Sequence, residues 1–322
     1  MKKIIVYGLG KIFHNRVKDD FIWWSKKYEI IAFCDTAYSE KNMYIDNVSY
    51  PIIKPYELTK YSFDMIMITS TKFFDEICEE LKQYGIQEEQ IKSIYDILWR
   101  NYIDFEELDT IKCVDIGGPS SIFRDIYDKV DLVDIVNFST VNEWNKQGLG
   151  NVFEYKEKKG SVIINDATDL EGIEDNSYDL VLSSNNLEHI ANPLKALLEW
   201  KRILKRNGRL VVVVPNKKKC FDHNRDDVTF KHLLDDYNNE VTEADLTHLD
   251  EILEKHDLSM DEQAGTYEEF KNRSLYNFEN RCLHHHVFNE EVLMKIGVFL
   301  EMNVCGISSN KGIDYIVSYK KN

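Results

Sequence analysis

A chain of 322 residues is longer than one typical domain, and its 43% apolar and 12% aromatic content can fill hydrophobic cores, which excludes a disordered protein. The formal net charge of -16 excludes a protein that coats nucleic acid or an anionic membrane, because neutralising phosphates requires a basic face. We therefore expect two folded domains, no nucleic-acid partner and no membrane insertion, although a local basic pocket stays compatible with this charge.

The start of the chain and its cysteines predict a cytoplasmic protein. MKKIIVYGLG places two lysines before an apolar run, as a signal peptide does, but the run is short and continues directly into a strand and helix pattern. No segment approaches the roughly 18 apolar residues of a membrane span. The six cysteines are scattered and form no C-x-x-C pair, which is typical of free thiols in a reducing compartment.

Apolar strand-like runs alternate with amphipathic helical runs over the first hundred residues. Strands are expected at residues 3–7, 29–35 and 63–70 and near Ile91, with a helix at 73–85. This alternation predicts an α/β domain with a parallel, doubly wound sheet over residues 1–100. Residues 101–110 contain no glycine, proline or serine, so we expect a packed connector there rather than a flexible linker.

The first strand ends in Gly8-Leu9-Gly10, and Asp35 ends the second. This start resembles the small Rossmann-like domain that is attached to enzymes of bacterial surface-glycan synthesis. A nicotinamide dinucleotide is one ligand for such a turn, which would make the protein an NAD-dependent oxidoreductase. Phe13 occupies the place of the third fingerprint glycine, and its bulk favours a docking domain or a surface for homo-oligomer formation.

A second α/β series begins at Ile111. Strands are expected at residues 111–116, 131–136, 161–165, 178–183 and 209–215, with a helix at 193–208 before the last of them. Pro193 suits the first turn of that helix, and Gly208 suits its end. A helix at 289–300 and two final strand-like runs complete a doubly wound, seven-stranded sheet with an antiparallel hairpin at one edge. Residues 216–288 interrupt the alternation with a charged, histidine-rich insertion.

The strand at 111–116 leads into Gly117-Gly118-Pro119-Ser120-Ser121 and then into a helical run. In an open α/β sheet, ligands bind where such a strand ends, because glycine lets the backbone approach the ligand and the helix offers free N–H groups. The glycine spacing is not G-x-G-x-x-G, so this turn by itself does not name its ligand.

Further pieces follow the turn in order: VDIV, NDATDL, and the run from Tyr178 to Asn216. With these pieces, the chain from Ile111 to its end, residues 111–322, resembles a class I S-adenosylmethionine-dependent methyltransferase with a Rossmann-like fold. The resemblance implies S-adenosyl-L-methionine as cofactor. It assigns the cofactor contacts to Asp115, Gly117, Gly118, Pro119, Asp134, Asp166, Ala167, Ser184 and Asn185.

The turn has two roles in this assignment. Gly117 and Gly118 let the main chain pass the methionine and ribose parts of the cofactor, and Asp115 acts on the ammonium group through its polar neighbours. The common family turn has a further glycine where this chain has Pro119 and Ser120. This departure indicates a slightly shifted cofactor, a subfamily, or a loss of cofactor affinity.

The later strand ends complete the assignment. Asp134 is the acceptor for the ribose hydroxyls, and Asp166 with the backbone at Ala167 is the acceptor for the adenine amino group. Ser184 and Asn185 form the floor of the pocket. A single acid of this kind is better explained as a helix cap or a solvated strand end, but four polar groups at successive strand ends favour a site.

Methyl transfer to a hydroxyl needs a base, and histidine is the natural base near neutral pH. The candidates are His189 after the fourth strand, His223 in the insertion, and a third group of His284, His285 and His286, from which we select His286. The 216–288 insertion resembles the helical lid of a subgroup of these methyltransferases that is associated with glycan clusters. A metal site formed by His223, His248 and the run His284 to His286 is the alternative, but no i,i+4 histidine pair and no C-x-x-C motif supports it.

We therefore expect an enzyme that methylates a small polar acceptor, namely an oxygen of a sugar or of a nucleotide-linked glycan precursor. Four cations would meet an anionic acceptor, or else lie on a solvated loop: Lys217, Lys218, Lys219 and Arg225. Two alternatives stay open: the NAD-dependent oxidoreductase run by the first domain, and a non-catalytic protein that binds S-adenosylmethionine as a scaffold.

Overall fold

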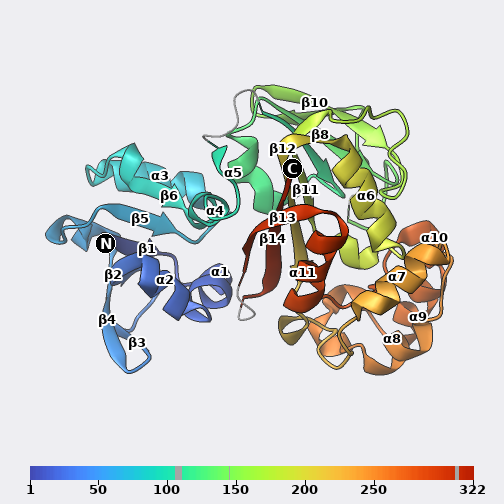
Figure 1. Cartoon of the computed structure of the whole chain (residues 1–322). Helices are drawn as coiled ribbons and strands as arrows, with labels where there is room; N and C mark the ends of the chain where they lie inside the picture. The colour runs from blue at the N-terminus through green and yellow to red at the C-terminus, as the bar shows by residue number, and fades with distance from the viewer. Residues whose placement is uncertain (106–110, 145, 309–311) are drawn as a thin grey trace. The chain divides into compact units, whose positions relative to one another are not determined.

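The computed structural model describes residues 1–105, 111–144, 146–308 and 312–322, and the chain forms two compact units, Met1–Arg100 and Asn101–Asn322 (Figure 1). Each unit is built on one mostly parallel sheet, which confirms two Rossmann-like domains. Part of the expected connector, residues 106–110, lies outside the described residues. Within the described ranges, no helix is both long enough and apolar enough to cross a membrane.

The first unit has a six-stranded sheet in the order β3-β4-β2-β1-β5-β6. Its strands are β1 (Lys2–Tyr7), β2 (Tyr28–Cys34), β3 (Asn42–Ile45), β4 (Val48–Ile53), β5 (Met65–Ile68) and β6 (Ile91–Ser93). Its helices are α1 (Lys11–Phe13), α2 (Phe21–Lys27), α3 (Phe74–Gln83) and α4 (Ile94–Trp99). The antiparallel β3–β4 hairpin was not expected from the sequence, and Asp46 and Asn47 form its turn with positive φ angles.

The glycine turn of the first unit is closed by the protein itself. The carboxylate of Asp35 accepts hydrogen bonds from the backbone N–H of Leu9 (2.8 Å), Ala37 (2.8 Å) and Tyr38 (3.0 Å). Lys54 Nζ donates to the backbone carbonyls of the same loop, Asp35 O among them at 3.3 Å. The acid that a dinucleotide ribose would use is thus engaged in holding the loop between β2 and β3.

The second unit has an eight-stranded sheet in the order β13-β14-β12-β11-β7-β8-β10-β9. Its strands are β7 (Lys112–Ile116), β8 (Leu132–Asn137), β9 (Val152–Tyr155), β10 (Lys158–Ile164), β11 (Tyr178–Ser184), β12 (Leu204–Pro215), β13 (Met302–Ile307) and β14 (Asp314–Lys321). The antiparallel β13–β14 pair at one edge confirms the expected hairpin. The eighth strand, β9, was not expected, and it pairs antiparallel with β10 at the other edge.

The helices of this unit are α5 (Arg124–Tyr127), α6 (Pro193–Ile203), α7 (Phe230–Asn238), α8 (Leu249–Lys255), α9 (Tyr267–Leu275), α10 (Asn277–Asn280) and α11 (Glu290–Phe299). The expected end of the helix at residue 208 was wrong. α6 stops at Ile203 because Leu204 already pairs with Tyr178 of β11, and β12 runs on through Gly208.

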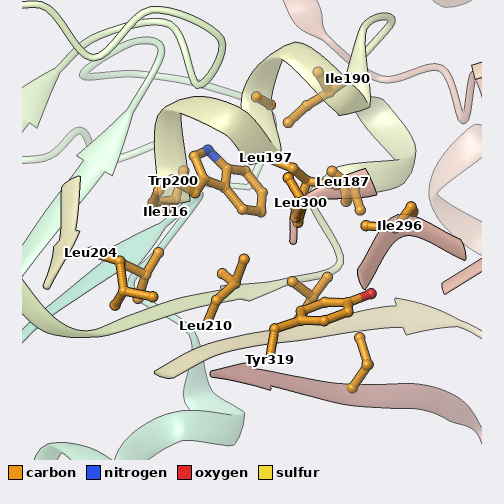
Figure 2. Close-up of a cluster of buried hydrophobic side chains, with 14 of the residues drawn as sticks. Ile116, Leu187, Ile190, Leu197, Trp200, Leu204, Leu210, Ile296, Leu300 and Tyr319 are labelled. Atoms are coloured by element: carbon orange, nitrogen blue, oxygen red, sulfur yellow. The ribbon is translucent and has the colours of Figure 1, made fainter. Parts of the chain in front are cut away.

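The core of the second unit lies between the sheet and the helices α6 and α11 (Figure 2). Trp200 of α6 is fully buried, and its indole N–H donates to Ala167 O at 3.0 Å. Tyr319 of β14 is also buried, and its hydroxyl donates to Leu293 O of α11 at 2.8 Å. These contacts fix the helices, and the loop after β10, on the sheet.

The insertion at 216–288 holds α7 to α10, which gather at one end of the second sheet, in orange in Figure 1. It has a small core of its own around Ile252, Ala264, Phe270 and Leu283. Leu233 of α7 instead joins the main core. The insertion is therefore a folded layer whose helix α7 packs against α6 and α11.

Candidate functional site

The backbone turns after β7 through Gly117 and Gly118, against the side chains of Asn186 and Asp115. Gly117 has a φ of +84°, and a Cβ there would lie 2.7 Å from Asn186 Cγ. A Cβ at Gly118 would lie 2.2 Å from Asp115 Oδ2. Both distances are far inside van der Waals contact, so the packing of the protein itself already requires glycine at these two positions.

The carboxylate of Asp115 holds this turn in place. Asp115 is fully buried, and its Oδ2 accepts hydrogen bonds from Ser120 N (2.8 Å) and from the Tyr127 hydroxyl (2.5 Å). Burial raises the pKa of Asp115 to about 6, while these hydrogen bonds act in the opposite direction. Pro119 follows Gly118 through a cis peptide bond within the same loop. Asp115 Oδ1 is buried and has no hydrogen-bond partner among the described residues.

Asp134 lies in the middle of β8 and not at its carboxyl end. Its Oδ1 accepts from Ser161 N (2.7 Å), and its Oδ2 accepts from the Tyr178 hydroxyl (2.8 Å). Asn137 is the last residue of β8, and its side-chain amide donates to Gly118 O at 3.1 Å. The structure therefore brings Asn137 to the glycine turn, whereas Asp134 ties neighbouring strands together further down the sheet.

Asp166 and Ala167 lie in the loop after β10. Asp166 Oδ1 accepts from the backbone N–H of Thr168 (2.9 Å) and from its hydroxyl (2.7 Å). The second oxygen, Oδ2, accepts from Arg281 Nη2 at 3.2 Å. Because Ala167 O accepts from the buried indole of Trp200, this loop is held firmly at the edge of the sheet.

Arg281 connects the insertion to this edge. Its Nη1 lies 2.5 Å from Glu243 Oε2, and its Nη2 pairs with Asp166. Its guanidinium carbon lies 5.6 Å from the ring centroids of both Phe138 and Phe278. Phe138 follows β8 directly, so Arg281 joins the loops after β8 and β10 to the insertion.

The loop after β11 reaches the turn through Asn186. Ser184 ends β11, and Asn185 is exposed, with its backbone N–H donating to Val213 O of β12 at 2.9 Å. The Asn186 amide donates to Ser183 Oγ at 3.3 Å, and its side chain packs on Gly117. Of the polar side chains in this loop, that of Asn186 contacts the turn.

Glu188 and His189, which directly follow this loop, form a polar cluster with His284, in which Glu188 and His284 are buried and His189 is half-buried. One side-chain polar atom from each of the three lies within 4.8 Å of the other two. Glu188 is 1% exposed, and both of its carboxyl oxygens have no hydrogen-bond partner among the described residues. The rings of His189 and His284 meet edge to face with centroids 4.5 Å apart, and Trp144 contacts His189 in the same way at 5.1 Å.

The electrostatics of this cluster follow from its burial. Burial raises the pKa of Glu188 to about 7, although the neighbouring His284 lowers it. Burial holds the pKa of His189 well below its ordinary range. For His284 burial acts downward, but the charge and hydrogen bond of Asp222 raise its pKa above the ordinary value. A carboxyl group that exchanges its proton near neutral pH therefore lies beside a neutral imidazole.

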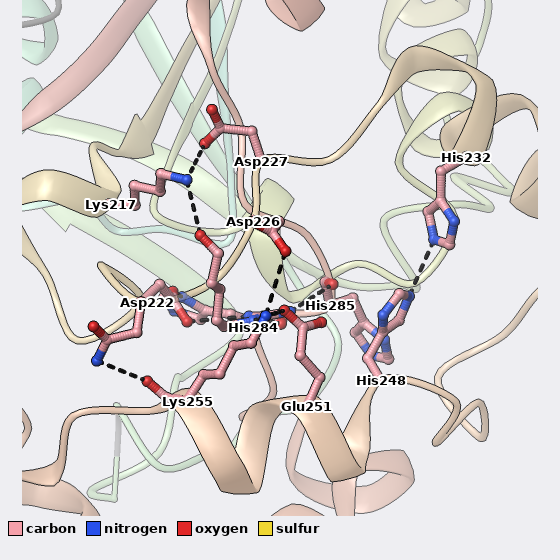
Figure 3. A network of polar contacts seen from close by, with 12 residues as sticks. Lys217, Asp222, Asp226, Asp227, His232, His248, Glu251, Lys255, His284 and His285 are labelled. Carbon is pink, nitrogen blue, oxygen red and sulfur yellow. Dashed lines mark hydrogen bonds and ion pairs between the residues drawn. The ribbon is translucent and has the colours of Figure 1, made fainter.

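Asp222 and Arg225 of the insertion support the cluster (Figure 3). Asp222 Oδ2 lies 2.6 Å from His284 Nδ1, and Arg225 Nη1 donates to Asp222 Oδ1 at 3.0 Å. Arg225 also donates to the backbone carbonyls of His284 (2.7 Å) and His285 (3.2 Å). Burial would raise the pKa of Asp222, but His284 and Arg225 hold it well below its ordinary value.

A small cavity of about 10 Å³ borders the cluster, and Glu188, Asp222 and His284 are among its lining residues. Lys217 also lines it, but its Nζ donates to Arg225 O at 2.8 Å and pairs with Asp227 at 2.9 Å. Two of the four cations that the sequence offered for an anionic acceptor, Lys217 and Arg225, are therefore engaged within the protein.

The other two candidate bases lie outside the cluster. His223 is exposed, and its Nε2 lies 2.9 Å from Asp257 Oδ2 within the insertion. His286 is buried, and its Nε2 lies 2.9 Å from Asp236 Oδ2. Of the three histidines expected to act on the acceptor, the structure brings only His189 next to Glu188 and His284.

Three residues of this edge were missed by the sequence analysis. Asn137 could have been found by extending the strand at 131–136 by one residue, since the residue after a buried strand reaches its carboxyl end. Glu188 lies between Leu187 and His189, and the apolar Leu187 is the only sign in the local sequence that Glu188 is buried. Asn186 carries no local signal, because only the fold places it on Gly117.

Two segments of the chain match known families. Residues 1–92 match the family described as C2185-like, N-terminal, and residues 125–212 match the methyltransferase domain. An uncharacterized protein of Methanocaldococcus jannaschii is 63% identical over 43 residues, which is 13% of this chain and 19% of that protein. The match thus spans about a fifth of the length of this relative.

Solved structures resemble the chain at low identity. An S-adenosylmethionine-dependent methyltransferase from Aquifex aeolicus is 15% identical, covering 69% of this chain and 92% of its own, with a TM-score of 0.37. Another from Mesorhizobium loti is 11% identical, covering 70% and 96%, with a TM-score of 0.41.

Proposed function

We propose that this protein methylates a hydroxyl of a small polar acceptor. The premise is that the second unit is an S-adenosylmethionine-dependent methyltransferase domain, with its family match at residues 125–212. The acceptor class that we propose is a sugar or a nucleotide-linked glycan precursor. The observation that supports a hydroxyl as the methylated group is the buried carboxyl of Glu188, which has no hydrogen-bond partner among the described residues. Methyl transfer to a hydroxyl requires such a proton acceptor.

The cofactor would lie along the carboxyl ends of β7, β8, β10 and β11. The Oδ1 oxygen of Asp115 fits an ammonium group, since a buried carboxylate oxygen without a partner is costly unless a ligand satisfies it. We place Asn137 in the ribose position that the sequence suggested for Asp134. Asp166 with Ala167 keeps the adenine position, and the loop from Ser184 to Asn186 keeps the floor of the pocket. S-adenosylmethionine supplies a methyl group that its sulfonium has already activated.

Arg281 contacts Asp166, the residue proposed for the adenine position. It occupies one oxygen of Asp166, and it also pairs with Glu243 of the insertion. Its guanidinium has no acceptor capacity, so it can orient Asp166 but cannot itself accept the adenine amino group. In this proposal Arg281 holds the insertion over the cofactor edge, as the lid expected at 216–288.

Glu188 is the proton acceptor in this proposal. Its pKa of about 7 matches neutral pH, where a general base works best. His189 is neutral and adjacent, so it would orient the hydroxyl of the acceptor by accepting a hydrogen bond from it or donating one to it. Asp222 fixes the ring of His284 through Nδ1 and acts on the reaction only through that ring.

The charges near Glu188 favour an uncharged reacting group. Two carboxyl groups, Glu188 and Asp222, line the cavity, and Arg225 is already paired with Asp222. A phosphate brought into the same cavity would meet like charges. A nucleotide-linked acceptor would therefore place its diphosphate outside the cavity and only its sugar hydroxyl within it.

The test combines binding and turnover. Calorimetry with S-adenosylhomocysteine checks the cofactor site, and a labelled methyl donor is then screened against sugars and nucleotide sugars. We expect binding to the wild type, product with a hydroxylated acceptor, and a fall in kcat of about 10² to 10⁴-fold in Glu188→Gln.

The matched control is Glu254→Gln, which changes an exposed carboxyl of α8 and should leave kcat unchanged. Binding without transfer to any hydroxylated acceptor would instead support the scaffold alternative. A nicotinamide difference spectrum without S-adenosylhomocysteine binding would support the oxidoreductase.

A further inference from the structure

Three imidazoles from separate segments of the insertion converge at a second place. His232 lies on α7, His248 directly precedes α8, and His286 lies in the extended segment before α11. One ring nitrogen of each lies within 4.8 Å of the other two. Figure 3 shows His232 and His248 facing each other, and their Nε2 atoms are 3.1 Å apart. We name these three residues the histidine cluster.

A carboxylate completes the surroundings of the histidine cluster. Asp236 follows His232 by one turn of α7, and its Oδ2 lies 3.3 Å from His232 Nε2. The same oxygen lies 2.9 Å from His286 Nε2. Asp236 is itself 8% exposed, and its backbone carbonyl accepts from the Asn192 amide at 3.2 Å. The carboxylate is thus held at the two imidazoles by α7 and by the loop before α6.

The separations suit one small cation. Ligands held at about 2.0 to 2.1 Å in tetrahedral geometry around Zn²⁺ are about 3.3 Å from one another. The 3.1 Å between the Nε2 atoms of His232 and His248 is close to that edge length. Hydrogen bonds join His232 to His248 and His286 to Asp236 in pairs, whereas one cation would join the three imidazoles at a single point.

The histidine cluster also contains a ring nitrogen that is not hydrogen-bonded within the described chain. A metal ligand must be the neutral imidazole, with a lone pair on the coordinating nitrogen. His286 Nδ1 is buried and has no partner among the described residues.

We propose that His232, His248 and His286 bind one divalent transition-metal ion, Zn²⁺ in preference to Mg²⁺ or Ca²⁺. Three neutral nitrogens with one carboxylate at hand are a donor set typical of Zn²⁺, whereas Mg²⁺ and Ca²⁺ select oxygen ligands. Asp236 orients the imidazoles and supplies one negative charge. No metal motif marks this site in the sequence, because its ligands come from distant segments.

The site would fix the segment that carries His284. His284 to His286 run past Glu188, with His285 N donating to Glu188 O at 2.8 Å. A metal at His286 would anchor this segment to α7 and to the start of α8, so that its removal loosens the insertion. The proposed ion is structural here, and the proposal does not depend on the acceptor or on the methyl transfer.

The test uses the full-length protein, stripped with a chelator and titrated with Zn²⁺ alone. We expect one ion per chain by calorimetry and by elemental analysis, a higher Tm with the ion, and the visible bands of tetrahedral Co²⁺ when Co²⁺ replaces it. His232→Ala and His248→Ala should each weaken binding at least a hundredfold, and Asp236→Asn about ten- to a hundredfold. Both histidines are only half-buried, so these truncations should fold, which circular dichroism checks.

The control is His14→Ala in the first unit, which should bind Zn²⁺ as the wild type does. Because six cysteines could bind Zn²⁺ elsewhere, wild-type affinity in both His232→Ala and His248→Ala would overturn the proposal. Absence of saturable Zn²⁺ binding to the folded wild type would overturn it as well. Loss of metal binding with unchanged S-adenosylhomocysteine binding separates this site from the methyltransferase site.

Discussion

Replacing Glu188 by glutamine tests whether its carboxyl is buried without a partner. The substitution keeps the shape of the side chain and removes only its ability to ionise. In the wild type the folded protein holds the pKa of Glu188 at about 7, against an ordinary value of 4.5. Burial is the main cause, so the folded state resists ionisation of this group and the unfolded state does not.

The direction and size of the effect follow from this difference. Below pH 4.5 the carboxyl is protonated in both states and costs nothing. Between pH 4.5 and 7 only the unfolded state ionises, so the stability of the folded wild type falls as the pH rises. Above pH 7 the loss is complete, and it amounts to about 3 kcal/mol.

The assay is denaturant unfolding of wild type, Glu188→Gln and Glu254→Gln at about pH 4.5 and about pH 8. The difference in free energy of unfolding between Glu188→Gln and the wild type should shift by about 3 kcal/mol in favour of the variant at the higher pH. Other titrating groups contribute to both proteins and largely cancel. A difference that is the same at both pH values would refute the reasoning, and so would the same shift in Glu254→Gln.

Three further predictions concern the turn, the strand ends and the core. Gly118→Ala places a Cβ 2.2 Å from Asp115 Oδ2, so we expect a loss of about 1–3 kcal/mol in unfolding experiments and weaker S-adenosylhomocysteine binding by calorimetry; unchanged binding would contradict the placement of the turn. Asp134→Asn should lower the free energy of unfolding by about 1–3 kcal/mol with little change in cofactor affinity. Asn137→Ala should instead weaken cofactor binding with little change in stability, and weaker binding in Asp134→Asn alone would return Asp134 to the ribose position. Trp200→Ala should lower the free energy of unfolding by about 3–5 kcal/mol, because this side chain is fully buried and bonded, and a loss below 1 kcal/mol would show that the core had been misassigned.

Local sequence patterns predicted most of the architecture. Buried parallel strands read as short apolar runs, and the glycines after β7 mark its end, so the two α/β units and the final antiparallel hairpin could be expected. The end of α6 could not, because the helical pattern continues past Ile203. Pairing of Leu204 with Tyr178 of β11 is a long-range interaction, and it overrides the local preference for helix.

The candidate site also has features that the local sequence predicts and features that only the tertiary structure determines. The sequence by itself determined that a glycine turn, a polar loop after each strand and a histidine-rich insertion belong to one domain, since each of these features is local. The tertiary structure alone decided which side chains meet: His284 joins Glu188 and His189, His286 joins His232 and His248, and His223 stays at the surface. Neighbours in the sequence enter different clusters here because convergence depends on packing between distant segments, and burial, which sets the pKa of Glu188, exists only once that packing has formed.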